Sequence, residues 1–192
     1  MKDPKVTNPD GTRLTIGPAR LSYVHVFEKW NPDGKEEGGK YCVTILIPKG
    51  EQATVDGIEK AVRAAASTPK ALKKFGGAVP KKLAKPLQDG DEKEKGGPEF
   101  EGCWYINAKT DKRPGLMARD GSAVVSADED EFYSGCWAYA SLSFYAYEVS
   151  GNRGVGCALN GLKKYRDDDR LGGGGGVTES DFDGMDDDDD DM

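Results

Sequence analysis

The amino-acid sequence predicts a mainly β fold: a barrel of five or six antiparallel strands, with an α-helix inserted after the second strand. Three observations support this prediction. Side chains from Cys136 to Val149 alternate with the period of two that is typical of a strand. Residues 12–30 and 40–48 are rich in the β-branched and aromatic residues that strands favour. Residues 51–67 instead carry their apolar side chains at helical spacing.

The first strand, residues 12–30, is expected to bend at Gly17-Pro18, where its apolar side chains change phase. Proline within a sheet is confined to edges and bulges, so a bulge or a sharp bend fits this position. Such a bend lets a strand turn the corner of a small barrel. A hairpin loop over residues 31–39 then leads to the second strand, Lys40–Pro48.

Two helices are expected next. The first, residues 51–67, should cover one end of the sheet, and Pro69 permits a short second helix over residues 70–75. Four later segments again have strand character: 100–108, 115–118, 122–126 and 135–149. The segments 115–118 and 122–126 flank a turn at residues 119–121.

The folded part is expected to close with an edge strand over residues 154–162 and a helical turn over the basic residues 163–166. Short, bent, antiparallel strands with one inserted helix suit a barrel of the oligonucleotide/oligosaccharide-binding kind, the OB-fold. Periodicity alone leaves a β-sandwich open as an alternative.

Charge divides the chain into a body and a tail. The net charge is −7, but residues 177–192 hold nine acidic residues and no basic one, so the remainder has 27 basic and 25 acidic residues. Five consecutive glycines at 172–176 precede this acidic segment, which cannot fold alone because its charges repel one another. We therefore expect an OB-fold domain over residues 1–170 and a flexible linker with a disordered acidic tail over 171–192.

The sequence offers little support for catalysis, a metal or a cofactor. His25 is the only histidine, and it has the strand-like surroundings of a structural residue. The four cysteines lack any C-x-x-C spacing, which favours a reduced, cytoplasmic protein. No dinucleotide-binding or Walker pattern is present, and the acidic runs that begin at Asp89 and Asp128 are typical of solvated loops. No signal peptide or membrane-spanning run is present either.

Binding of single-stranded DNA is better supported. Sequence-tolerant binding needs aromatic faces for the bases and a basic groove for the backbone. In the strand 135–149 one face is small and apolar, whereas the other carries four large aromatic side chains. The candidates for base stacking are Trp30, Tyr41, Trp104, Tyr105, Trp137, Tyr139, Tyr145 and Tyr147. An equally open reading is that these rings cover a barrel end or a dimer contact.

Basic residues accompany the aromatic ones, mostly in loops. The candidates for phosphate contacts are Lys35, Lys40, Lys73, Lys74, Lys109, Lys112, Arg113 and Arg119. A flexible segment of about 20 residues has an r.m.s. reach of roughly 25 Å, so the acidic tail can fold back and compete with DNA for such a surface. The tail residues assigned to this role, and to partner recruitment, are Asp181, Phe182, Asp183, Asp186, Asp187, Asp188, Asp189, Asp190 and Asp191.

The sequence also resembles phage single-stranded DNA-binding proteins of the DUF2815 family. The matching segments are RLSYVHVFEKW at 20–30, KYCVTILIPK at 40–49, FEGCWYINAKTDKRPGL at 100–116, and residues 132–174 with their Y-S-G-C, N-x-G-x-G and L-x-x-x-K-x-R-D patterns. This resemblance implies an OB-fold without enzymatic activity that coats unwound DNA in phage replication, recombination or repair. It further implies the cytoplasm of an infected bacterial host, and replication proteins as partners of the tail. Acidic tails of related binders often end in phenylalanine, whereas this one ends in Asp191-Met192.

Two other functions stay open at this point. One is a structural or protein-interaction barrel that binds no DNA, with a tail that only confers solubility. The other, weaker one is a Mg²⁺-dependent nuclease that uses the acidic loops. A homodimer is also conceivable, because exposed aromatic edges often pair.

Overall fold

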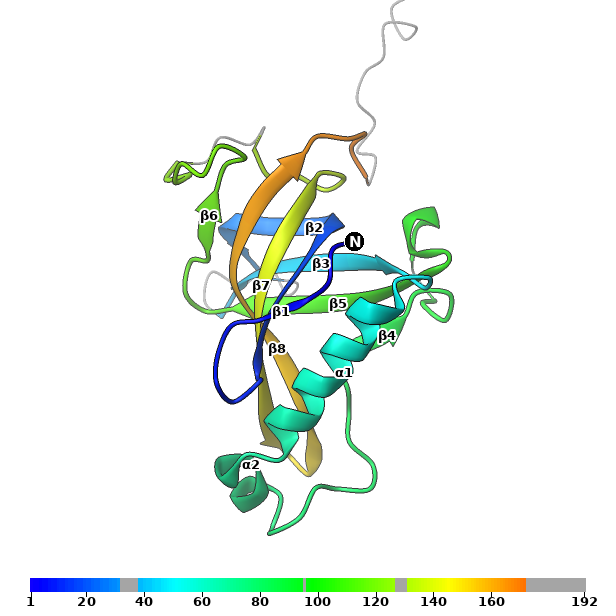
Figure 1. Ribbon diagram of the computed structural model, residues 1–192, viewed down its shortest axis with the longest axis vertical. Coiled ribbons are helices and arrows are strands. Elements are labelled where there is room, and N and C mark those ends of the chain that lie inside the picture. The colour runs from blue at the N-terminus through cyan, green and yellow to red at the C-terminus, as the bar shows by residue number, and fades with distance from the viewer. Residues whose placement is uncertain (32–37, 95, 127–130, 172–192) are drawn as a thin grey trace, which may run out of the picture.

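The computed structural model describes residues 1–31, 38–94, 96–126 and 131–171 (Figure 1). Its described strands form one sheet in the order β4-β5-β3-β2-β7-β8-β6, and β1 pairs with β2. The strands are β1 (Lys5–Val6), β2 (Arg13–Trp30), β3 (Lys40–Pro48), β4 (Leu87–Asp89), β5 (Cys103–Thr110), β6 (Gly115–Met117), β7 (Trp137–Val149) and β8 (Asn152–Arg166). The long strands pair antiparallel, and β3 and β5 cross the long β7–β8 hairpin at a steep angle in the view of Figure 1.

The predicted bend in the first strand is confirmed. The Gly17–Pro18 peptide bond is cis, and the register of β2 on β7 shifts between Ile16 and Ala19. Gly17 has a φ of 130°, and a Cβ atom there would lie 2.8 Å from the carbonyl oxygen of Ala138. Only glycine therefore fits at this bend, where β2 and β7 lie in close contact.

The last strand is longer than predicted. The helical turn expected over residues 163–166 is wrong, because β8 continues to Arg166. The physical reason is that β7 offers pairing partners along this whole length, so that Lys163 lies opposite Tyr139 and Arg166 opposite Trp137. Beyond it, β6 pairs with β8 in parallel.

The predicted helices are confirmed with small shifts of their ends. Helix α1 spans Gln52–Ala66, and α2 spans Pro69–Lys74. The apolar face of α1 is buried and contacts β2, β7 and β8, so the helix covers one end of the sheet (Figure 1). The Thr68 hydroxyl caps α2 by accepting a hydrogen bond from the Ala71 N–H, at 3.2 Å. A short 3₁₀ helix, η1 (Pro98–Phe100), precedes β5.

The core confirms the alternation of β7. On the small apolar face of this strand, together with Cys136 just before it, every side chain is at most 8% exposed: Cys136, Ala138, Ala140, Leu142, Phe144 and Ala146. The aromatic face of β7 consequently points away from the core. The four cysteines are free, and burial raises the pKa of the Cys157 thiol.

Several predictions fall outside the described residues. These are the loop position Lys35, residues 128–130 of the acidic run that begins at Asp128, the glycine linker 172–176 and the acidic tail 177–192. Among the residues that the structure does describe, no helix is long and apolar enough to cross a membrane.

Candidate nucleic-acid interface

A groove lies on the outer face of β2, β3 and β5. Its floor follows from strand register, because Cys42 of β3 pairs with His25 of β2 on one side and with Lys109 of β5 on the other. Thr44 pairs in the same way with Ser22 and Asn107. The groove has a volume of about 200 Å³ and is lined by Tyr23, His25, Trp30, Cys42, Val43, Thr44, Lys93, Asn107 and Lys109.

Two aromatic side chains of this groove are open to solvent. Tyr23 is 50% exposed and Trp30 is 44% exposed. The Trp30 ring stacks on the imidazole of His25, with centroids 5.6 Å apart and planes inclined by 25°. Burial lowers the pKa of His25, so at neutral pH this stack is between uncharged rings. One face of Trp30 is thus supported from within the protein, and its exposed surface is left for a ligand.

The position of Tyr23 depends on an irregularity in β2. The register of β2 on β3 shifts between Ser22 and His25, and Tyr23 has a φ of 47°. A bulge of this kind redirects a side chain relative to the regular alternation. The Tyr23 ring tilts against Phe100 of η1, with centroids 6.3 Å apart.

Lysine ammonium groups lie along the same groove. Lys109 lines it from β5, and Lys93 lines it from the loop before η1. The Lys93 Nζ atom lies 5.1 Å from the ring centroids of both Phe100 and Tyr105. The groove therefore combines exposed ring faces with positive charge, the two features that a single nucleic-acid strand requires.

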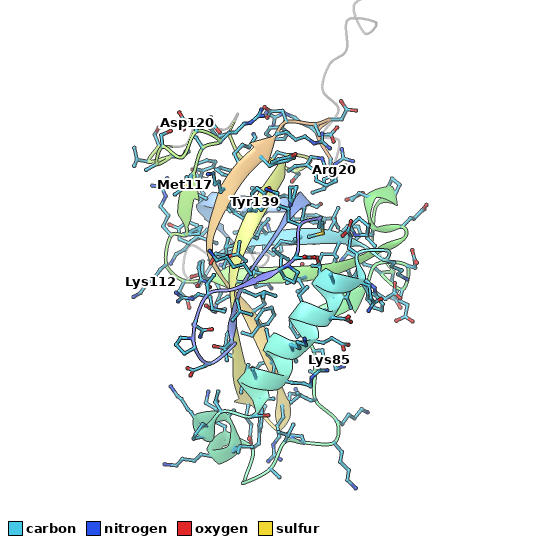
Figure 2. The ribbon with its side chains drawn as sticks, in the orientation of Figure 1. Arg20, Lys85, Lys112, Met117, Asp120 and Tyr139 are labelled. Atoms are coloured by element: carbon cyan, nitrogen blue, oxygen red, sulfur yellow. The ribbon has the colours of Figure 1, made fainter. Side chains whose placement is uncertain are left out.

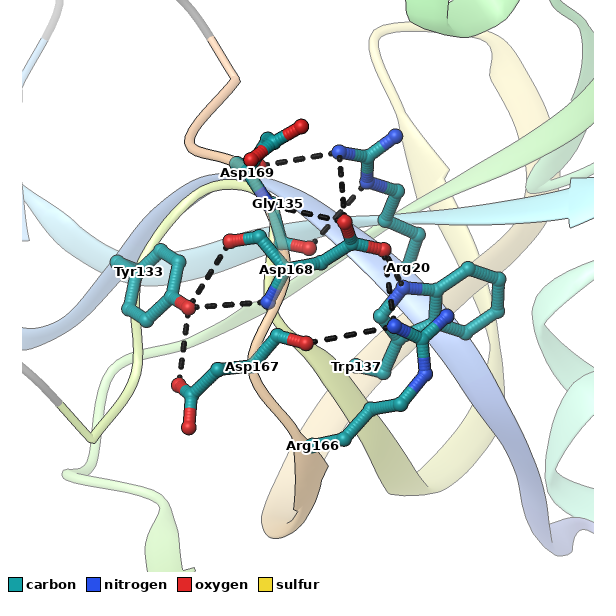
Figure 3. A network of polar contacts seen from close by, with 8 residues as sticks. All are labelled: Arg20, Tyr133, Gly135, Trp137, Arg166, Asp167, Asp168 and Asp169. Atoms are coloured by element: carbon teal, nitrogen blue, oxygen red, sulfur yellow. Dashed lines mark hydrogen bonds and ion pairs between the residues drawn. The ribbon is translucent and has the colours of Figure 1, made fainter.

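A second polar cluster surrounds Trp137 on β7 (Figure 3). Asp168 accepts hydrogen bonds through Oδ2 from Trp137 Nε1 at 2.7 Å and from Arg166 at 3.0 Å. The Arg20 guanidinium lies 3.9 Å from the other carboxylate oxygen. The hydrogen bond from Trp137 and these cations hold the pKa of Asp168 at about 2, so the carboxylate is ionised at neutral pH. The Arg166 guanidinium also lies 4.5 Å from the Trp137 ring centroid. The indole therefore contacts Asp168 through its N–H and Arg166 through one ring face.

Residues 167–171, the C-terminal strap, run from this cluster to the groove. The Tyr133 hydroxyl lies 2.9 Å from Asp167 Oδ1 and accepts a hydrogen bond from the Asp168 N–H. The Leu171 N–H donates to the carbonyl oxygen of Ser134 at 2.8 Å. The Leu171 side chain packs on the cluster of Leu46, Phe100 and Tyr105, and it lines one hollow together with His25. The strap thus ends next to the groove.

The other aromatic residues predicted to stack on bases lie outside the groove, at several different places in the structure. Tyr139 packs edge-on against Tyr165 of β8, with centroids 5.8 Å apart. Trp104 lines an apolar cleft against α1, on the side of β5 away from the groove. Tyr105 is buried and donates its hydroxyl hydrogen to Gln88 at 2.5 Å. Only Trp30 of the predicted set combines high exposure with a place in the groove.

Tyr41, Tyr145 and Tyr147 lie elsewhere again. Tyr41 has the Lys29 ammonium 5.9 Å from its ring centroid. A Cβ atom at Gly156 would lie 2.6 Å from the Tyr145 ring, and one at Gly154 would lie 2.6 Å from the Tyr147 hydroxyl, so these two rings cover glycines of β8.

The predicted basic residues do not converge either. Lys40 pairs with Asp111 at 3.4 Å. Lys73 and Lys74 lie on α2, where Lys74 donates to the carbonyl oxygen of Ala146 on β7. Lys112, Arg113 and Arg119 are exposed in the loops on either side of β6. Figure 2 shows Lys112 and Asp120, from these two loops, on the β6 side of the molecule and Lys85 on the other side. Of the predicted lysines that the structure describes, Lys109 lines the groove.

Comparison with known proteins identifies the family. A family model described as the single-stranded DNA-binding protein of Enterobacter phage Enc34 matches residues 12–192. The chain belongs to this family. Its sequence is 28% identical over 179 residues to protein p50 of Acyrthosiphon pisum secondary endosymbiont phage 1, which covers 90% of this chain and 94% of p50. The resemblance to phage single-stranded DNA-binding proteins expected from the sequence is confirmed.

Solved structures agree with this assignment to the Enc34 family. The Enc34 single-stranded DNA-binding protein in complex with single-stranded DNA has a TM-score of 0.74 and 25% identity, covering 90% of this chain and 95% of the Enc34 chain. The single-stranded DNA-binding protein gp2.5 of bacteriophage T7 has a TM-score of 0.58 and 15% identity, covering 94% of this chain and 97% of gp2.5. The second likeness shows a shared fold only.

The sequence-based set of binding residues for this Enc34-family chain did not include the aromatic and basic groove residues Tyr23, His25 and Lys93. Tyr23 and His25 lie in a predicted strand, but the bulge between Ser22 and His25 breaks the alternation that would have assigned them to a face. Lys93 lies in a loop that contains both acidic and basic residues, so its sequence did not indicate a phosphate contact. Among the described residues, no group of histidine, cysteine and acidic side chains could hold a metal ion.

Proposed function

We propose that this chain is a sequence-tolerant single-stranded DNA-binding protein whose groove on β2, β3 and β5 receives the strand. One observation carries the proposal: the exposed rings of Tyr23 and Trp30 lie in one groove with the ammonium groups of Lys93 and Lys109. Membership of the Enc34 family, and the Enc34 structure described in complex with single-stranded DNA, support it.

Binding in this groove follows from simple chemistry. Each base presents a π face to which an aromatic ring can stack, whatever the base, and one such contact contributes about 1–3 kcal/mol. The lysines attract the phosphates and release counterions, which makes the affinity depend on salt. Neither interaction reads base edges, so the protein would coat and protect unwound DNA of any sequence. This role suits phage replication, recombination and repair.

We further propose that the acidic tail competes with DNA for the groove. Support comes from the strap, since Leu171 lies beside the groove and the tail follows it in sequence after a short glycine linker. A tethered competitor acts at an effective concentration in the millimolar range, which suffices for weak electrostatic binding to matter. Once DNA displaces it, the tail would be free to recruit replication proteins.

The proposal is tested by titrating the full-length protein with oligo-dT and with duplex DNA of equal length. Single-stranded DNA should quench tryptophan fluorescence, and log affinity should fall against log salt with a slope of about −0.7 per phosphate contacted. Duplex DNA should bind more weakly. If oligo-dT neither quenches fluorescence nor shifts the protein in an electrophoretic assay, the alternative of a protein-interaction barrel takes its place. Mg²⁺ should not cause cleavage of the bound oligonucleotide.

A further inference from the structure

An anion-binding point exists outside the groove, above Trp137. Arg20 from β2 and Arg166 from β8 flank Trp137 of β7, because the register pairs Trp137 with both of them. Their guanidinium groups and the indole N–H converge on one place, which the carboxylate of Asp168 fills (Figure 3). Two hydrogen-bond donors, from Trp137 and Arg166, and the Arg20 guanidinium at ion-pair distance thus form a binding site that the chain's own strap occupies.

The donors of this site suit a phosphate as well as a carboxylate. Arginine forms charge-assisted hydrogen bonds to both carboxylate and phosphate, with two parallel N–H groups meeting two oxygens of the anion. The Trp137 ring beneath Arg166 adds an aromatic surface next to the anion. One nucleotide presents the matching pair of groups, a phosphate and a flat base.

We propose that Arg20, Arg166 and Trp137 form a second contact site for single-stranded DNA, and that Asp168 occupies its phosphate position as an internal competitor. The proposal rests on the DNA binding proposed above and extends it from the groove to the β7 face. The strap reaches from this site to the groove, so a strand that leaves the groove along the strap arrives at Trp137. A strand bound here must first displace Asp168.

The strap is held in a way that permits displacement. Its contacts around Asp168 are polar and partly open to solvent, since the exposed fractions of the Arg20, Asp168 and Arg166 side chains are 28%, 29% and 46%. Partly exposed ion pairs are weak and are screened by salt. A phosphate chain with several negative charges can therefore compete with one carboxylate.

The test compares Asp168→Ala with Asp169→Ala in the full-length protein. Both variants remove one negative charge from the strap, but the Asp169 contact to Arg20 is made by its backbone carbonyl and survives the substitution. Asp168→Ala should bind oligo-dT about 3- to 10-fold more tightly at low salt, the effect of one partly exposed ionic contact. Its salt slope should steepen by about 0.7 for the phosphate gained. Asp169→Ala should match the wild type in both quantities.

A loosened strap could also raise the affinity by moving the tail away from the groove, and a third variant separates the two effects. Adding Arg166→Gln to Asp168→Ala removes a donor of the site without touching the groove, so the gain and the steeper slope should both disappear. If the double variant keeps the gain, or if Asp168→Ala binds no more tightly than Asp169→Ala, the second site is refuted.

Two further measurements keep the outcome clear. If Asp168→Ala fails to fold by circular dichroism, Asp168→Asn replaces it, since an amide oxygen can still accept from Trp137 Nε1 while the charge is gone. The wild type is titrated in parallel. Absence of any wild-type binding overturns the proposed function together with this inference, whereas normal wild-type binding with no gain in the variants overturns this inference alone.

Discussion

Replacing Trp30 by leucine tests the groove most directly. The leucine keeps apolar bulk against His25 but removes the ring, which is 44% exposed and stacked at 5.6 Å on the imidazole. Loss of one base–aromatic contact should weaken oligo-dT binding by about 1–3 kcal/mol, which is roughly 5- to 150-fold in Kd. Because no phosphate contact is lost, the slope of log affinity against log salt should stay as in the wild type.

Trp104→Leu is the matched control for this prediction. Trp104 was a stacking candidate from sequence, but it lies against α1 on the side of β5 away from the groove. Its substitution should lower the melting temperature while leaving the DNA affinity of the folded protein close to that of the wild type. Fluorescence anisotropy with a labelled oligo-dT, repeated from 50 to 300 mM NaCl, measures affinity and slope together. Equal affinity losses in both variants, or a loss in Trp104→Leu alone, would refute the assignment of the groove.

Three further predictions concern the tail, the strap and the bend. Deletion of residues 177–192 should tighten oligo-dT binding at low salt, with the gain fading as salt screens the tail; anisotropy that shows no change would exclude competition by the tail. The pKa of Asp168 is lowered to about 2 in the folded state from its ordinary value of 3.8. The ionised Asp168 therefore stabilises the fold above about pH 4, and this contribution is lost as the pH falls toward 2. Asp168→Asn should have a lower melting temperature than the wild type at pH 7. The difference in melting temperature should shrink as the pH is lowered from 4 to 2. Gly17→Ala should lower the free energy of unfolding, measured in urea, by about 1–3 kcal/mol. The reason is that Gly17 has a φ of 130° and that a Cβ atom there would lie 2.8 Å from the Ala138 carbonyl oxygen. Unchanged stability would mean that the bend can relax to accept a methyl group.

Local pattern predicted the long strands and both helices, but it missed β1 and β4, and residues 122–126 do not form the strand that was expected. The alternation along β7 assigned Leu142 and Phe144 to the core, and the structure buries both almost completely. The switch of period after Pro48 placed the first helix, and Gly17-Pro18 placed the bend. Each of these signals lies within a few neighbouring residues, since side-chain direction repeats every two residues in a strand and every 3.6 in a helix.

The C-terminal end of β8 could not be predicted from local pattern. Residues 163–166 carry no strand pattern of their own that excludes a turn, and their conformation is decided by pairing with β7 about 25 residues earlier. The sequence also predicted outward aromatic residues without distinguishing Trp30 from Trp137. Both are in strands and both point away from the core.

The sequence by itself determined a mainly β fold with a slightly basic body, an acidic tail and an outward row of rings on β7. Only the tertiary structure decided what each ring meets. Trp137 meets Asp168, which lies 31 residues away in sequence, while Trp30 meets His25 in an open groove next to Lys109. The reason is that alternation fixes the direction of a side chain, whereas its neighbours on that face come from strand register and from segments that cross the sheet, and both depend on contacts far apart along the chain.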